Sequence, residues 1–100
     1  MSETETVFEW KLDSGLNPEV WLYVNPLNGR YAKVRDDYGP LAVFKDENVG
    51  RAYEQKSKIL RNMIGHYVEF SEMLKIAKEK HSGKYELINS VEWLIVLVLL

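Results

Sequence analysis

The stretch "EVWLYV" (Glu19 to Val24) decides which fold this chain of 100 residues can adopt. Every position after the first is apolar or aromatic, and valine, tryptophan and tyrosine favour extended backbone. Because successive side chains of a strand point to opposite faces of a sheet, both faces of this strand are apolar. A sheet built around it therefore needs cover on both sides.

Further strands are predicted on either side of this stretch. "NPLNGR" (Asn25 to Arg30) contains an Asn-Gly pair that readily adopts positive φ, which predicts a hairpin returning into residues 30–36. "LAVF" (Leu41 to Phe44) is a short apolar strand, and "VFEWKLD" (Val7 to Asp13) alternates as a strand with one wet face does. Up to four strands are therefore expected before residue 46.

The spacing of apolar residues changes from two to three or four after Asp46, as in an amphipathic helix that Asp46 or Asn48 could cap. The pattern ends at "HSG" and Gly83. In heptads it resembles a coiled coil whose stripe is Val49, Tyr53, Lys56, Leu60, Met63, Tyr67, Phe70, Leu74 and Ala77. Gly65 inside a helix costs about 1 kcal/mol. One continuous helix and two helices broken near Asn62–Gly65 both stay open.

The closing run "VEWLIVLVLL" (Val91 to Leu100) is apolar on both faces if extended. As a helix it would rise about 15 Å, half of a bilayer core of roughly 30 Å. We therefore predict a buried strand. The alternative is the first half of a transmembrane helix in a chain that continues past Leu100.

Together these patterns predict one α+β domain, in which a small antiparallel or mixed β-sheet packs on one long amphipathic helix. The expected segments are a flexible acidic N-terminus (1–6), a β-rich part (7–45), the long helix (46–82) and the C-terminal apolar strand (85–100).

Composition limits the classes of function. The hydrophobic fraction of 46% predicts a folded chain, and a net charge of −2 gives no overall attraction to nucleic acid. The absence of cysteine excludes disulfides and thiol nucleophiles, and it favours a reducing compartment. The acidic N-terminus lacks the pattern of an export signal. A cytoplasmic protein is expected.

A homodimer is expected from the need to cover both faces of the sheet. One helix covers one face only, and a continuous helix over 46–82 would be about 50 Å long, which is more than a compact domain of this size can shelter. A second copy would supply both missing contacts. The predicted dimer interface is Leu60, Met63, Tyr67, Phe70 and Leu74.

Basic residues mark a second candidate surface. Tyr31 lies among basic side chains of the hairpin, and more follow at the predicted helix start. The candidate basic patch, which could hold phosphate, is Arg30, Lys33, Arg35, Lys58 and Arg61. Acidic residues are interleaved with it, so nucleic acid is disfavoured as the partner.

No metal site, cofactor or catalytic residue is expected. His66 and Glu69 would lie one helical turn apart, but two ligands rarely hold a metal. No serine or histidine has the spacing of a nucleophile with its base. The sequence predicts a small non-enzymatic homodimeric interaction protein that binds or blocks a macromolecular partner, most simply another protein. The alternatives are the soluble portion of a membrane-anchored protein and a weak nucleic-acid-binding protein.

Overall fold

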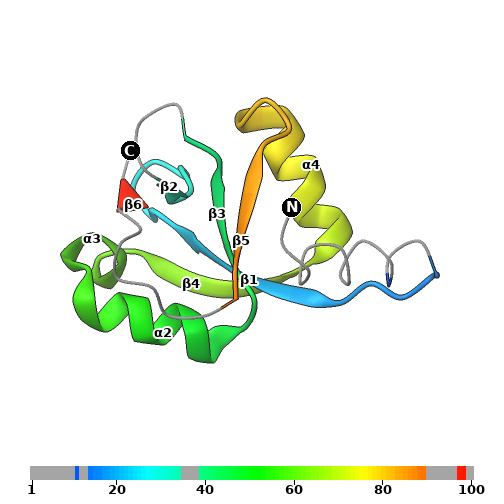
Figure 1. Ribbon diagram of the computed structural model, residues 1–100. Coiled ribbons are helices and arrows are strands. Elements are labelled where there is room, and N and C mark those ends of the chain that lie inside the picture. Colours follow the sequence, from blue (N-terminus) through cyan, green and yellow to red (C-terminus); the bar gives the residue numbers. More distant parts are fainter. Residues whose placement is uncertain (1–10, 12–13, 35–38, 90–96, 99–100) are drawn as a thin grey trace.

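The computed structural model describes residues 11, 14–34, 39–89 and 97–98 (Figure 1). Its elements are β1 (Glu19–Val24), β2 (Lys33–Val34), β3 (Leu41–Phe44), α2 (Glu47–Lys56), α3 (Lys58–Arg61), β4 (Ile64–Glu69), α4 (Phe70–Lys80), β5 (Tyr85–Ile88) and β6 (Leu97–Val98). The predicted α+β class is confirmed. The strands predicted at 19–24 and 41–44 are confirmed with the same bounds.

The strands form one mixed sheet in the order β4-β1-β3-β2-β6, with β5 joined to β3. β1 and β4 pair antiparallel over their whole length, from Glu19↔Glu69 to Val24↔Ile64. β3 and β5 run parallel, while β2 pairs antiparallel with β3 and β6. β1 and β3 lie inside this sheet and carry the buried side chains expected of them.

Helices cover both faces of the sheet within the single chain. Figure 1 shows α2 and α3 on one side of the sheet and α4 on the other. The α2/α3-side core comprises Trp21, Tyr23, Ala32, Val34, Ala42, Phe44, Tyr53, Leu60, Met63 and Ile88. The α4-side core comprises Val20, Leu22, Leu41, Val43, Phe70, Met73, Ala77 and Leu87. Alternate residues of β1 and β3 enter opposite cores, so the cover that "EVWLYV" requires comes from this chain's own helices.

The predicted turn at Asn25–Arg30 is confirmed. Gly29 has φ +71°, and the Asn25 amide donates to the Arg30 carbonyl at 2.8 Å. The returning strand pairs with β1 only briefly, through the Val24↔Tyr31 bridge and the bond from the Ala32 amide to the Tyr23 carbonyl. The chain then continues into β2, so the hairpin is shorter than the sequence predicts.

The prediction of one long helix over 46–82 is wrong, and so is the coiled coil. Asp46 does cap α2, accepting from the Val49 amide at 2.9 Å, but α2 ends before Ser57. The Ser57 hydroxyl accepts from the Leu60 amide at 3.2 Å and starts the short α3. Residues 64–69 then form β4. Six residue pairs with β1 outweigh the helical spacing of their side chains, because tertiary pairing overrides local propensity.

The five residues of the predicted dimer interface therefore share no surface. Leu60 and Met63 enter the α2/α3-side core, while Phe70 lies in the α4-side core and Leu74 packs against it. Tyr67 is 42% exposed, and its hydroxyl accepts from the Glu47 amide at 3.0 Å. The reasons given for a homodimer, an uncovered face and a protruding helix, are both absent from the described residues.

Two glycines make room for one tryptophan. The indole of Trp21 lies so close to Gly50 of α2 and Gly65 of β4 that a Cβ at either position would overlap it. Tyr67 meets the ring edge-on at a centroid distance of 4.9 Å, and the Arg51 guanidinium lies 5.1 Å from its centroid. Gly65, which the sequence places as a weak point in a helix, is instead the site of close packing between β4 and β1.

A loop residue caps α4. Glu69 at the N-cap position makes no side-chain capping bond. Asn17, which precedes β1 at the same end of the β1–β4 pair, supplies it: its Oδ1 accepts from the Ser71 amide at 3.0 Å, and its Nδ2 donates to the Ser71 hydroxyl at 2.7 Å. The same Nδ2 donates to Glu69 at 3.0 Å. One side chain thereby joins the start of β1 to the start of α4.

Two predicted segments fall largely outside the described residues. The strand predicted at Val7–Asp13 and the N-terminus at 1–6 lie there, apart from Lys11. Of the run from Val91 to Leu100, only Leu97–Val98 is described, as β6 paired with β2. These two residues belong to the sheet, as predicted for a strand.

Candidate functional site

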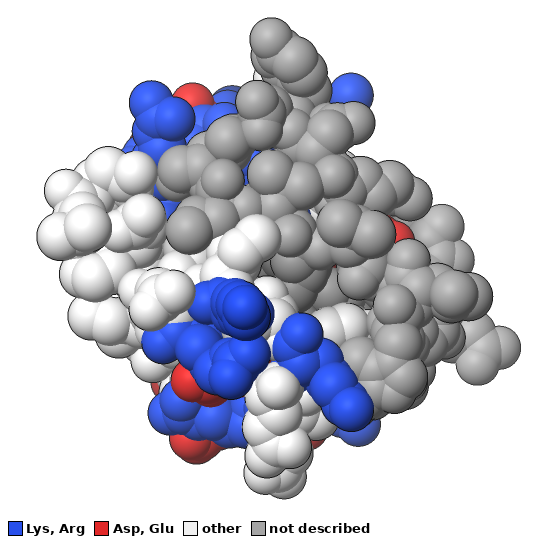
Figure 2. Space-filling model, turned by 90° about the vertical axis from the view of Figure 1, so that its left-hand side faces the viewer, with Lys and Arg blue, Asp and Glu red and all other residues white. Residues whose placement is uncertain are grey.

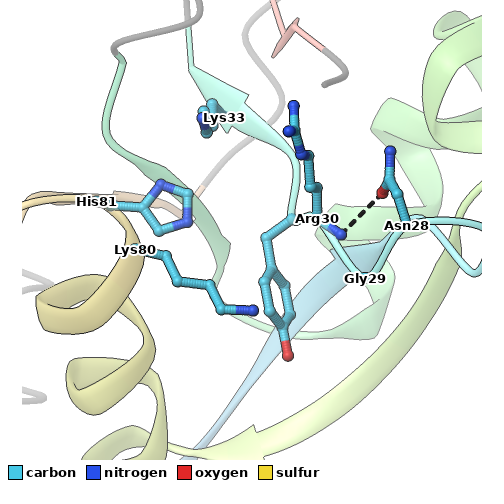
Figure 3. Close-up of a pocket in the computed structure, with 7 residues that line it drawn as sticks. Asn28, Gly29, Arg30, Lys33, Lys80 and His81 are labelled. Atoms are coloured by element: carbon cyan, nitrogen blue, oxygen red, sulfur yellow. Dashed lines mark hydrogen bonds between the residues drawn. The ribbon is translucent and has the colours of Figure 1, made fainter.

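A pocket of about 330 Å³ opens between the β1–β2 turn and the end of α4. Its lining consists of Asn28, Gly29, Arg30, Tyr31, Lys33, Lys80 and His81. Figure 3 shows Asn28 and Arg30 on one side of it, Lys80 and His81 on the other, and Lys33 beside them. Two segments about fifty residues apart in the sequence thus meet at this pocket.

The turn presents its side of the pocket through local hydrogen bonds. The Asn28 Oδ1 accepts from the Arg30 amide at 2.9 Å (Figure 3), and the Gly29 amide donates to the Asn25 carbonyl at 2.8 Å. These bonds, with the positive φ of Gly29, fix the direction in which the chain leaves the turn. Arg30 and Tyr31 follow at once, so their place at the pocket depends on the turn.

The opposite side of the pocket is formed by the C-terminus of α4. The amides of His81 and Gly83 both donate to the Ala77 carbonyl at 2.8 Å. Ser82 and Gly83 have φ values of +56° and +76°, which end the helix abruptly. The last helical residue, Lys80, and the cap residue His81 are thereby held beside the turn.

The described residues that line the pocket include three cations and no carboxylate. Arg30 and Lys80 are exposed, and Lys33 is half-buried. The Lys80 ammonium lies 5.7 Å from the centroid of the Tyr31 ring, within the range of a cation–π contact. Burial, helped by the charge of Glu72, raises the pKa of Tyr31, so its phenol stays protonated at neutral pH. The site offers positive charge around an aromatic ring.

His81 is the buried polar group of the site. Only 7% of the residue is exposed, and its Nδ1 makes no hydrogen bond with any described residue. Burial, and to a smaller extent the positive charges of Lys33 and Lys80, lower the pKa of His81 to about 4. Figure 3 shows the imidazole pointing from the end of α4 toward the turn. A neutral ring, whose Nδ1 has no partner among the described residues, therefore lies among cations.

The candidate basic patch divides in the structure. Arg30 and Lys33 line the pocket, whereas Lys58 and Arg61 belong to α3; Arg35 lies outside the described residues. Arg61 borders a separate hollow of about 280 Å³ with Arg51, Glu54 and Gln55. Viewed from the side on which α3 lies, Figure 2 shows Lys and Arg gathered with Asp and Glu beside them. Lys and Arg predominate on the described part of this face.

On α2, the Arg51 guanidinium is already paired. Arg51 bonds Glu47 at 3.2 Å and Glu54 at 2.8 Å, and the Tyr23 hydroxyl donates to Glu54 at 2.9 Å. Burial raises the pKa of Tyr23 to about 12, and the nearby Trp21 indole opposes the increase in part. The indole N–H of Trp21 forms no hydrogen bond with a described residue. This network has satisfied charges and fixes α2 to the sheet.

Sequence reasoning missed Lys80 and His81. Both follow the helical stripe, where basic residues are ordinary partners of the helix dipole, and nothing in their spacing relates them to Arg30. The pair His66 and Glu69 shows the opposite error. They belong to β4, where residues three apart point to opposite faces, so the helical metal spacing does not apply. Among the described residues, no group of three or more His, Cys, Asp or Glu could hold a metal ion.

Comparison with protein-family models finds no match, and comparisons with curated proteins and with solved structures find none either. Within the described part of the chain, no helix has the length and apolar character needed to cross a membrane.

Proposed function

We propose that this protein is a non-enzymatic interaction protein that binds an acidic segment of a partner protein at the pocket between the β1–β2 turn and α4. The observation that carries the proposal is the lining: Arg30, Lys33 and Lys80 surround one hollow to which no acidic side chain of the described residues contributes. Its volume lies at the lower end of the range found for ligand pockets. Lysine and arginine there would pair with carboxylates of the partner.

A protein partner is favoured over a nucleic acid by the charge around the pocket. The chain has a net charge of −2, and the neighbouring face in Figure 2 mixes both signs. A nucleic acid needs a continuous basic track that follows several phosphates, whereas a short acidic segment needs one concentrated site. The pocket provides the second.

Self-association is not part of this proposal. Both faces of the sheet are already covered, and Leu60, Met63 and Phe70 are buried in the single chain. The pocket is formed by one chain alone, from residues 28–33 and 80–81. A monomer therefore suffices to bind the partner.

The test is fluorescence anisotropy with a labelled Gly/Ser peptide that carries a run of glutamates. Saturable binding that weakens with added salt is expected, because exposed charge pairs are screened. Lys80→Gln should weaken binding about three- to fivefold. Lys78→Gln is the matched control, since Lys78 lies in the same last turn of α4, is exposed and is absent from the pocket lining. Equal effects of the two variants would sink the proposed site, because they would indicate net charge alone.

A further inference from the structure

We infer that the group recognised in this pocket is a phosphate monoester carried by the partner protein, such as a phosphorylated serine or threonine. The inference rests on the proposed function and narrows its ligand. Three observations support it: the surplus of positive charge, the buried imidazole of His81, and the size of the pocket.

The charge of the pocket exceeds what one carboxylate neutralises. Arg30 and Lys80 contribute two positive charges to the lining, and the Lys33 side chain lies beside them. A phosphate monoester carries about −1.5 to −2 near pH 7 and three strong acceptor oxygens, against one charge and two oxygens for a carboxylate. Arginine binds two phosphate oxygens in its fork, and lysine binds the anion as a point charge. A lining with arginine and lysine therefore suits a phosphate monoester better than a carboxylate.

His81 places a buried imidazole in the lining of the pocket. The ring is 7% exposed, its Nδ1 has no partner among the described residues, and burial keeps it neutral. A buried polar nitrogen without a partner costs free energy. Nδ1 itself is enclosed, so a phosphate oxygen reaches it only after the ring turns toward the pocket; with the proton on Nδ1, a neutral imidazole would then donate to that oxygen and remove the cost. The Tyr31 ring, with Lys80 beside it, forms an apolar wall for the carbon chain that carries the phosphate.

The volume agrees with a phosphorylated side chain. About 330 Å³ exceeds the needs of a single inorganic anion and lies at the lower end of ligand pockets. The site is a hollow between a turn and a helix end, which admits a side chain from outside. A phosphoserine with part of its backbone is a ligand of that scale.

The experiment compares four probes on the full chain: a Gly/Ser peptide with one phosphoserine flanked by glutamates, the same peptide with glutamate in place of phosphoserine, inorganic phosphate, and a 5′-phosphorylated oligonucleotide. We expect the phosphopeptide to bind about tenfold more tightly than the glutamate peptide, the effect of one further charge-assisted hydrogen bond. Inorganic phosphate should displace it weakly and shift the NMR signals of Arg30, Tyr31, Lys80 and His81.

Two pairs of variants of equal charge locate the binding. Arg30→Gln and Lys80→Gln should each remove most of the preference for phosphoserine, whereas Arg61→Gln and Lys78→Gln should leave it intact. All four residues are exposed, so the fold is retained. His81→Phe keeps a buried ring without a donor. It should reduce the preference while binding of the glutamate peptide is kept.

Each remaining outcome has a fixed meaning. Equal affinity for the phosphoserine and glutamate peptides overturns this inference and leaves the proposed function standing. Binding of neither peptide overturns both. Tighter binding of the oligonucleotide than of the phosphopeptide overturns the protein partner and assigns the pocket to nucleic acid.

Discussion

The two faces of the sheet are covered in different ways. On the α2/α3 side, aromatic rings interlock: Tyr23 meets Phe44 at 5.5 Å between centroids, Phe44 meets Tyr53 at 5.5 Å, and Trp21 fills the space left by two glycines. On the α4 side, one helix contributes Phe70, Met73 and Ala77 to the core. It is fixed at both ends, by Asn17 at its start and by the His81 cap at its finish. The first face depends on shape, and the second depends on the position of one helix.

Removal of Phe70 should give the largest loss on the α4 side. Phe70 is fully buried, so Phe70→Ala should lower the free energy of unfolding by about 3–5 kcal/mol. Leu74 belongs to the same predicted stripe but is only partly buried, so Leu74→Ala should lower the free energy of unfolding by less. Chemical denaturation at several protein concentrations measures both. A midpoint of the unaltered protein that rises with concentration would contradict the single-chain core and support the homodimer.

The glycine contacts on the α2/α3 side can be tested by a double-mutant cycle. Gly65→Ala places a methyl group against the Trp21 indole and should cost about 1–3 kcal/mol, as overpacked cores do. In a Trp21→Phe background the smaller ring leaves room, so the same change should cost much less. Equal costs in both backgrounds would show that the glycine acts through its backbone and not through the indole.

The sequence predicts the elements that local residues determine and misses the element that depends on pairing with a distant strand. Strands β1 and β3 were predicted with their bounds because their apolar, β-prone runs are bordered by turn residues. The segment 64–69 was mistaken for helix because "IGHYVE" continues a three- and four-residue spacing by coincidence. Its β structure depends on pairing with β1, about forty-five residues earlier, and no local pattern contains that pairing.

The candidate site was half predicted for a similar reason. Arg30 and Lys33 follow a recognisable turn, so their grouping was visible in the sequence. Lys80 and His81 reach the same pocket because β4 runs antiparallel to β1 and α4 then packs across the sheet toward the turn. A strand prediction for "IGHYVE" would have replaced the long helix by a short one that starts beside β1. The C-terminus of that short helix, with Lys80 and His81, could then have been placed near the turn. The error in one element therefore concealed half of the site.

The C-terminal end of α4 should make stability depend on pH. His81 has a pKa of about 4 in the folded chain against an ordinary value of 6.5, so the unfolded chain binds a proton more readily. Above pH 6.5 the ring is neutral in both states and costs no stability. As the pH falls from 6.5 to about 4, proton uptake by the unfolded chain lowers the free energy of unfolding. The full shift corresponds to about 3 kcal/mol, which screening at the pocket mouth reduces to about 1–2 kcal/mol. Denaturation from pH 7 to 4 measures this, with His81→Phe expected to flatten the profile.

At the N-terminal end of α4, the expected loss of unfolding free energy is smaller than at the C-terminal end. Asn17→Ala removes the side chain that accepts from the Ser71 amide, and loss of such a cap typically costs about 1 kcal/mol. The native N-cap residue Glu69 makes no capping bond of its own, so nothing nearby replaces it. Asn48→Ala, an exposed change on α2, is the control and should not destabilise the chain. Hydrogen exchange adds a local measurement: the first turn of α4 should lose protection in Asn17→Ala while β1 and β3 keep theirs. Uniform loss across the sheet would mean that Asn17 stabilises the β1–β4 pair instead of the helix.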